Sequence, residues 1–169
     1  MKKKIILIFL WFFIWFYLEK DNYGNKIDDK TGSTPLFFNK AIEFSLPDLS
    51  DNQVSLSDFK DQVILLTFWT SRCPYCLREV PILKEIYKEY AEKVKIISIV
   101  IGEDKESIKR FKEREKIPYL ILLDREGEVS RLYKVLGVPT DIIIDRERNI
   151  RYYNFYWPKN LKEIIETLL

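Results

Sequence analysis

The sequence contains no histidine, only two cysteines, five glycines and one methionine among its 169 residues. Without histidine, the chain lacks the usual general base of Cys-His and Ser-His catalysis and the commonest zinc ligand. Two cysteines are too few for a disulfide framework or for a four-thiolate metal site. The available chemistry is therefore that of thiols, carboxylates, hydroxyls and lysines, and no metal is expected.

An excess of charge of one sign is also lacking, because the formal net charge is only +2. No stripe of lysine and arginine is interleaved with aromatic residues, so nucleic acid is not an expected partner. Hydrophobic residues make up 47% of the chain and aromatic residues 15%, which is enough to bury a core. The length predicts one globular domain after a short N-terminal segment.

The N-terminus begins with Lys2, Lys3 and Lys4, followed by an uncharged run over residues 5–18. This pattern predicts an export signal; a buried N-terminal helix fits less well, because the run is apolar on all sides. As a helix the run spans about 21 Å, shorter than the roughly 30 Å hydrocarbon core, which favours a cleaved signal peptide. No small-x-small cleavage motif follows it, and we therefore favour an uncleaved signal anchor over residues 1–21.

The lysines also predict the orientation of the chain. Three lysines precede the apolar run and one follows closely, which indicates a cytoplasmic N-terminus and a single-pass anchor in the cell membrane. The domain is then expected on the extracytoplasmic side, either periplasmic or extracellular. Residues 22–35 are polar and rich in turn formers, as in a linker, and residues 36–169 form the predicted domain.

Hydrophobic periodicity predicts alternating strands and helices in this domain. The expected strands cover residues 42–46, 54–56, 63–69, 95–101, 119–123, 141–145 and 150–155. The expected helices cover residues 74–93, 105–116, 128–136 and 158–169. Residues 63–69 read VILLTFW, a continuous apolar run typical of a central strand buried on both faces. The order predicts an α/β fold, with a mixed central sheet covered by helices on both faces.

The two cysteines form the motif Cys73-Pro74-Tyr75-Cys76, where the predicted central strand passes into a helix. At a helix start, the backbone N–H groups and the helix dipole stabilise a thiolate at Cys73, and Arg72 adds a neighbouring cation. Cys73 is therefore the candidate nucleophile. Cys76 lies on the same helical face and is the candidate resolving thiol. A structural disulfide and half of a zinc site completed by another chain are the alternatives.

Residues 69–76, Glu79, Pro81 and the Gly-Val-Pro-Thr run of residues 137–140 resemble the thioredoxin superfamily. More narrowly, they resemble its membrane-anchored TlpA and ResA type, over roughly residues 36–169. The resemblance implies a thioredoxin fold with an N-terminal β extension and with a proline inside the active-site helix. It also implies that Pro139 is a cis-proline facing the dithiol, and that Val138 offers backbone hydrogen bonds to an extended substrate.

The resemblance further implies that Glu79 lies near the active site and tunes the thiols. Thr67 occupies the position at which cytosolic thioredoxins carry a buried aspartate that assists proton transfer. Glu79 is therefore expected to be the nearest general base for Cys76. The alternative is an ordinary solvated carboxylate on the helix surface.

The surroundings of the motif depart from the family in two places, because Arg72 replaces a common tryptophan and Leu77 replaces a common basic residue. The Pro-Tyr dipeptide is that of glutaredoxins, whose potentials lie at about −200 to −230 mV. The residues expected to contact substrate are Trp69, Arg72, Pro74, Tyr75, Val138 and Pro139.

These features together predict an extracytoplasmic thiol-disulfide oxidoreductase that reduces protein disulfides through Cys73 and Cys76. No cofactor is expected beyond this redox-active disulfide. The resemblance implies apocytochrome c as a typical client, in cytochrome c maturation, and a membrane electron donor of thiol type. A thiol peroxidase is an alternative, since Thr70 precedes Cys73 at peroxiredoxin spacing, although the proline expected before it is missing. A redox-inert binding or chaperone module is the other alternative.

Overall fold

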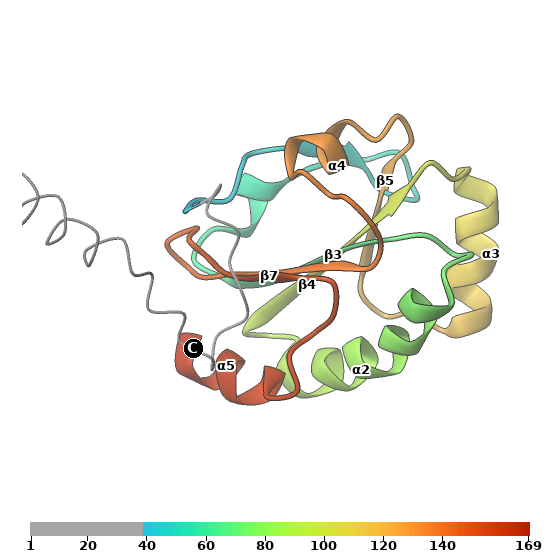
Figure 1. Ribbon diagram of the computed structural model, residues 1–169. Coiled ribbons are helices and arrows are strands. Elements are labelled where there is room, and N and C mark those ends of the chain that lie inside the picture. The colour runs from blue at the N-terminus through green and yellow to red at the C-terminus, as the bar shows by residue number, and fades with distance from the viewer. Residues whose placement is uncertain (1–38) are drawn as a thin grey trace, which may run out of the picture. The chain divides into compact units, whose positions relative to one another are not determined.

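The computed structural model describes residues 39–169, which are coloured in Figure 1. The expected signal anchor over residues 1–21 and linker over residues 22–35 lie outside the described residues and stay predictions. Within residues 39–169, no helix combines the length and the apolar character that crossing a membrane requires.

A five-stranded sheet forms the centre of the domain, with the strand order β5-β4-β3-β6-β7. Its strands are β3 (Val63–Trp69), β4 (Val94–Ile101), β5 (Leu120–Asp124), β6 (Thr140–Ile144) and β7 (Ile150–Asn154). Strands β3, β4 and β5 run parallel, whereas β6 and β7 pair antiparallel. Every residue of β3 is buried, as its unbroken apolar sequence predicts, and the mixed sheet is confirmed.

Helices cover both faces of this sheet (Figure 1). One face packs against α2 (Pro74–Tyr90), α3 (Lys105–Glu115) and α5 (Leu161–Leu168). The other face packs against α4 (Glu128–Leu132) and the 3-10 helix η2 (Leu56–Phe59). Beside η2 lies a small hairpin of β1 (Ser45–Pro47) and β2 (Gln53–Ser55), which is the predicted N-terminal β element. The two apolar cores therefore lie on opposite sides of one sheet.

The first strand begins later than predicted, at Ser45 instead of residue 42. The backbone groups before it are used by other partners. The carbonyl of Ile42 accepts a hydrogen bond of 2.6 Å from the Tyr133 hydroxyl, and the carbonyl of Phe44 accepts one of 3.0 Å from the Leu56 amide. Alternating hydrophobicity in this segment thus reflects packing against the domain and not pairing in a ladder.

All four helices are shorter than predicted, and two of them, α4 and α5, are shorter by four residues each. The helix expected over residues 128–136 ends at Leu132, because Lys134 adopts a positive φ of 54° that a helix does not accept. The last helix begins at Leu161 and not at residue 158, since the Leu161 amide bonds to the Pro158 carbonyl at 3.1 Å in a preceding turn. In contrast, Pro81 lies inside α2 as expected.

Candidate active site

Cys73 is the N-cap residue of α2, at the end of the short loop that leaves β3. Its amide donates to the Thr70 carbonyl at 3.3 Å, and its own carbonyl accepts the first helical hydrogen bond from the Leu77 amide at 3.1 Å. The Cys76 amide points at the Cys73 sulfur, with N and Sγ 3.2 Å apart. A backbone donor and the positive end of the helix dipole therefore face this sulfur, which favours its thiolate.

A disulfide joins Cys73 to Cys76, and their Cα atoms are 5.3 Å apart. The two sulfurs differ in their access to solvent. Cys76 is 3% exposed and belongs to the core on the α2 face, whereas Cys73 is half-buried at its edge. An external thiol or disulfide therefore reaches Cys73 first, and the roles of nucleophile and resolving thiol stay predictions.

The loop before β6 closes over the disulfide from the other side. The peptide bond between Val138 and Pro139 is cis, as the resemblance implied. The Val138 carbonyl oxygen lies 3.6 Å from Cys73 Sγ. The Thr140 hydroxyl donates to the Gly137 carbonyl at 2.7 Å and so braces the turn. Residues 65 positions apart in the sequence thus meet at one sulfur.

Glu79 lies one helical turn beyond Cys76 and is 6% exposed, so it is not a solvated surface carboxylate. Burial raises the pKa of Glu79 to about 7, although the Asp141 carboxyl and the Trp157 amide oppose this rise by favouring the ionised form. Glu79 is therefore a buried carboxyl on the helix that begins at the two thiols, and its role as a general base stays a prediction.

Asp141 is a site residue that the sequence analysis did not find. It lies on β6 directly opposite Thr67 of β3 and is completely buried. Burial and the neighbouring Glu79 carboxyl raise its pKa well above the usual value. Within residues 39–169 neither carboxylate oxygen of Asp141 has a hydrogen bond of good geometry, although Glu79 and the Thr67 hydroxyl lie close enough to influence it. A single aspartate at the start of a predicted strand carries no signal of this burial.

Apart from Val138 and Pro139 of the cis loop, the residues expected to contact substrate divide into two groups. Arg72, Pro74 and Tyr75 lie on the exposed surface next to the disulfide. Tyr75 is 51% exposed, and its ring lies under the Arg78 guanidinium, 4.5 Å from the ring centre. Trp69 is instead part of the core, with its ring centre 5.2 Å from that of Phe111. A direct contact of Trp69 with substrate would require this ring to leave the core.

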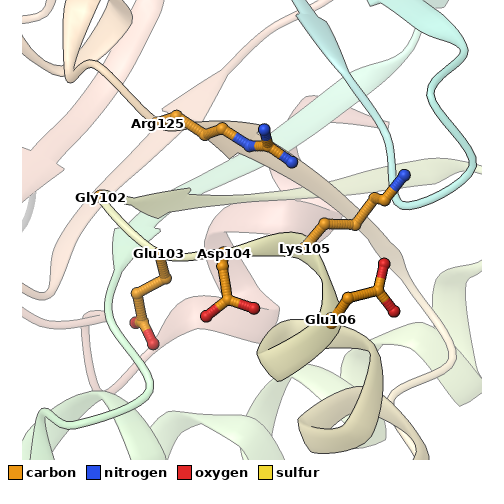
Figure 2. Close-up of a pocket in the computed structure, with 6 residues that line it drawn as sticks. All are labelled: Gly102, Glu103, Asp104, Lys105, Glu106 and Arg125. Carbon is orange, nitrogen blue, oxygen red and sulfur yellow. The ribbon is translucent and has the colours of Figure 1, made fainter.

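The loop that follows β4 supports the active-site loop. The Glu103 carboxylate accepts hydrogen bonds from both the amide and the hydroxyl of Ser71, two residues before Cys73. Glu103, Asp104, Lys105 and Arg125 line a depression in the surface. Figure 2 shows the Glu103 and Asp104 carboxylates turned away from Arg125. Asp104 caps α3 through the Ser107 amide. The carboxyl ends of β3 and β4 are thereby tied together at the site.

The AhpC/TSA family matches residues 38–153, which is more than half of the chain. The chain belongs to the AhpC/TSA family. Thioredoxin-like protein YneN of Bacillus subtilis is 38% identical over 60 residues, covering 36% of this chain and 35% of that protein. Thiol-disulfide oxidoreductase ResA of Geobacillus kaustophilus is 35% identical over 91 residues, covering 51% and 49%. The chain thus matches between about a third and half of the length of these curated relatives.

Solved structures agree with this family. The thioredoxin domain of a thiol-disulfide oxidoreductase from Bacteroides vulgatus matches with a TM-score of 0.68 and 27% identity, over 81% of this chain and 96% of that one. StoA from Bacillus subtilis matches in fold with a TM-score of 0.62 and 23% identity, over 74% of this chain and 95% of that one. These matches confirm the predicted resemblance to the thioredoxin superfamily and to its TlpA and ResA type.

Proposed function

We propose that the protein is a thiol-disulfide oxidoreductase that reduces disulfide bonds in other proteins. One observation carries this proposal: an accessible Cys73 at the N-terminus of α2 is linked to a buried Cys76 and faced by the cis peptide of Pro139. The names of YneN and ResA agree with it. The reaction uses no cofactor beyond the two thiols.

The mechanism follows from the different positions of the two sulfurs. In the reduced protein the Cys73 thiolate, stabilised by the Cys76 amide and the helix dipole, attacks a client disulfide and forms a mixed disulfide. The Cys76 thiol then attacks Cys73 and releases the reduced client. Glu79 is the proposed general base that accepts the Cys76 proton, because it is buried one helical turn away.

The surface beside the disulfide supports a protein segment as the substrate. A cavity of about 180 Å³ opens there, lined by Tyr75, Arg78, Glu79, Ile82, Tyr156 and Trp157. Pockets for small organic ligands usually measure about 300–1,000 Å³, whereas this cavity has the size of a side chain. Arg72, Pro74 and Tyr75 on one side, with the backbone of Val138 and Pro139 on the other, form the proposed contact surface for an extended client.

The proposed location is the extracytoplasmic side of the cell membrane, with residues 1–21 as the anchor. Support comes from the lysines and the apolar run at the N-terminus of the sequence. In that compartment the oxidised dithiol must be reduced again after each reaction. We assign this step to a membrane electron donor of thiol type. Apocytochrome c is the proposed client, since cytochrome c maturation requires free thiols for haem attachment.

The activity is tested by insulin-disulfide reduction with the full-length protein and dithiothreitol as the electron source. Wild type is expected to accelerate the reaction, while Cys73→Ser is expected to fall to the uncatalysed rate, because no nucleophile remains at the accessible position. Cys76→Ser should form a mixed disulfide without turnover. Equal rates for wild type and Cys73→Ser would refute the proposal.

Peroxide reduction is the second candidate, favoured by the AhpC/TSA family match and by Thr70 at peroxiredoxin spacing from Cys73. The same proteins are therefore assayed with hydrogen peroxide as the oxidant. A rate of peroxide consumption well above that of insulin reduction would establish the peroxidase in place of the disulfide reductase.

A further inference from the structure

Two buried carboxyl groups, those of Glu79 and Asp141, meet between α2 and the central sheet. Asp141 pairs with Thr67 across β3 and β6, and residues directly opposite in such a ladder place their side chains on the same face. On β3 this face also carries Leu65 and Trp69, which share a core cluster with Cys76. The Asp141 side chain therefore points toward the helix that carries the resolving thiol.

Glu79 approaches the same place from α2. It is 6% exposed and Asp141 is completely buried, and each carboxyl influences the ionisation of the other. Within residues 39–169, the Thr67 hydroxyl and the Trp157 amide favour ionisation of the pair, and no lysine or arginine is found to do so. Two negative charges are not stable at such a place without a cation.

Two buried tyrosines also interact electrostatically with this pair, Tyr119 with Glu79 and Tyr152 of β7 with both carboxyls. Burial and the neighbouring carboxyls raise the pKa of Tyr152 to about 12, and that of Tyr119 further, so both hydroxyls stay neutral near pH 7. Burial and the neighbouring Glu79 carboxyl raise the pKa of Asp141 well above its usual value. Because two adjacent buried negative charges are disfavoured, Asp141 keeps its proton when Glu79 ionises.

We propose that Asp141 is a positioning residue for the thiol chemistry: its protonated carboxyl donates a hydrogen bond to Glu79 and keeps that carboxylate ready to accept the proton of Cys76. This inference rests on the proposed function and adds a second carboxyl to it. Without the donor on β6, Glu79 would be a lone carboxyl in an apolar core and would hold its own proton near neutral pH.

The proton and electron balance of the resolving step is complete. The Cys76 S–H bond breaks and its proton moves to Glu79, the Cys73–Cys76 bond forms, and the bond between Cys73 and the client sulfur breaks. The electron pair of that bond leaves on the client as a thiolate. The dithiol is oxidised by two electrons and the client disulfide is reduced by two. Glu79 returns the proton to Cys76 when a donor dithiol reduces the protein again.

The test separates the two thiols by stopped flow. Reduced full-length protein is mixed with one equivalent of 5,5′-dithiobis(2-nitrobenzoate), which releases one thiolate when Cys73 attacks and a second when Cys76 resolves. In wild type the rate of the second phase should rise with an inflection near pH 7. Asp141→Leu, which lacks a donor, should move this inflection upward by about one pH unit and slow the second phase about fivefold at pH 7. Asp141→Asn, which keeps a donor, should resemble wild type.

The first phase and a second buried aspartate serve as controls. Asp124 of β5 is 1% exposed but is held by the Ser130 amide and the Val129 amide, in the core on the other face. Asp124→Asn should leave the pH profiles of both phases unchanged, and the first phase should keep its profile in every variant. An active wild type with an unshifted Asp141→Leu profile overturns the inference alone. A wild type without a second phase overturns the proposed function as well.

A measurement on wild type covers the case in which Asp141→Leu does not fold. Carbon-13 labelling of the carboxyl groups allows Glu79 and Asp141 to be titrated separately by NMR in the reduced full-length protein. Asp141 is expected to stay protonated while Glu79 ionises. Ionisation of Asp141 at the ordinary aspartate pH of about 4 would refute the inference.

Discussion

Glu79, the proposed general base, also affects the stability of the folded protein. Burial raises its pKa from the usual 4.5 to about 7, so the folded protein holds a proton at this group that the unfolded chain has already lost. The stability that depends on this proton is complete below about pH 4.5 and is lost as the pH rises through about 7. A group suited to proton transfer near neutral pH therefore lowers stability there.

Glu79→Gln removes this titration while keeping the size of the side chain. Between pH 4.5 and 8 the unfolding free energy of wild type should fall by roughly 3 kcal/mol more than that of Glu79→Gln. Guanidinium denaturation of the two oxidised proteins across this pH range measures the difference. Parallel curves for the two proteins would show that the Glu79 carboxyl titrates in the folded state as it does in the unfolded chain.

At the scale of elements, the active-site loop depends on a neighbouring loop of the sheet. Ser71 donates two hydrogen bonds to Glu103, which follows β4, and these bonds fix the approach of the chain to Cys73. Hydrogen bonds to charged groups contribute about 1.5–3 kcal/mol each, more than neutral ones. The pair therefore holds the start of α2 against the end of β4.

Glu103→Gln leaves one acceptor oxygen but removes the charge. We expect the unfolding free energy of the oxidised protein to fall by about 1–2 kcal/mol, measured by chemical denaturation at pH 7. Glu106→Gln is the matched control, since Glu106 is an exposed glutamate in the first turn of α3 and lines the same depression as Glu103 (Figure 2). It should stay within about 0.5 kcal/mol of wild type. Equal values for both variants would contradict the supporting role of Glu103.

The elements that the sequence predicts well are those with one dominant local signal. The run VILLTFW has no polar alternative to burial, and β3 has the predicted bounds. The predicted helix over residues 128–136 is too long, because the apolar spacing continues through Tyr133. The chain leaves the helix at the positive φ of Lys134, and a lysine gives no indication of such a backbone conformation. Asp141 escaped prediction for a different reason. Its burial arises from the register with Thr67, and pairing between distant strands is not visible in either segment alone.

At the scale of the whole molecule, the site combines parts of the chain that are far apart in sequence. The loop after β3, the N-terminus of α2, the cis loop before β6 and the loop after β4 meet around one disulfide. All of this machinery lies within residues 39–169. The compartment in which it works depends on the N-terminal segment, and this prediction is open to a direct test.

Replacing Lys2, Lys3 and Lys4 by glutamine removes the charge difference that predicts the orientation. The fraction of molecules with an outward-facing domain should fall from nearly all to roughly half. In intact cells, labelling of reduced Cys73 by a membrane-impermeant maleimide measures this fraction. The matched control replaces three exposed lysines of the domain, Lys88, Lys93 and Lys159, by glutamine and should keep full labelling. Absence of labelling in wild-type cells would refute the extracytoplasmic location.

Because the two sulfurs are unequally exposed, only one of them is accessible to redox partners. In the proposed reaction, electrons enter and leave through Cys73, because Cys76 is 3% exposed and is not accessible to an external partner. The proposed client and electron donor must therefore dock at the same place, in turn, and each is excluded while the other is bound. Such a carrier shuttles between two partners that never need to contact each other, and any surface change that improves docking of one partner also changes competition with the other.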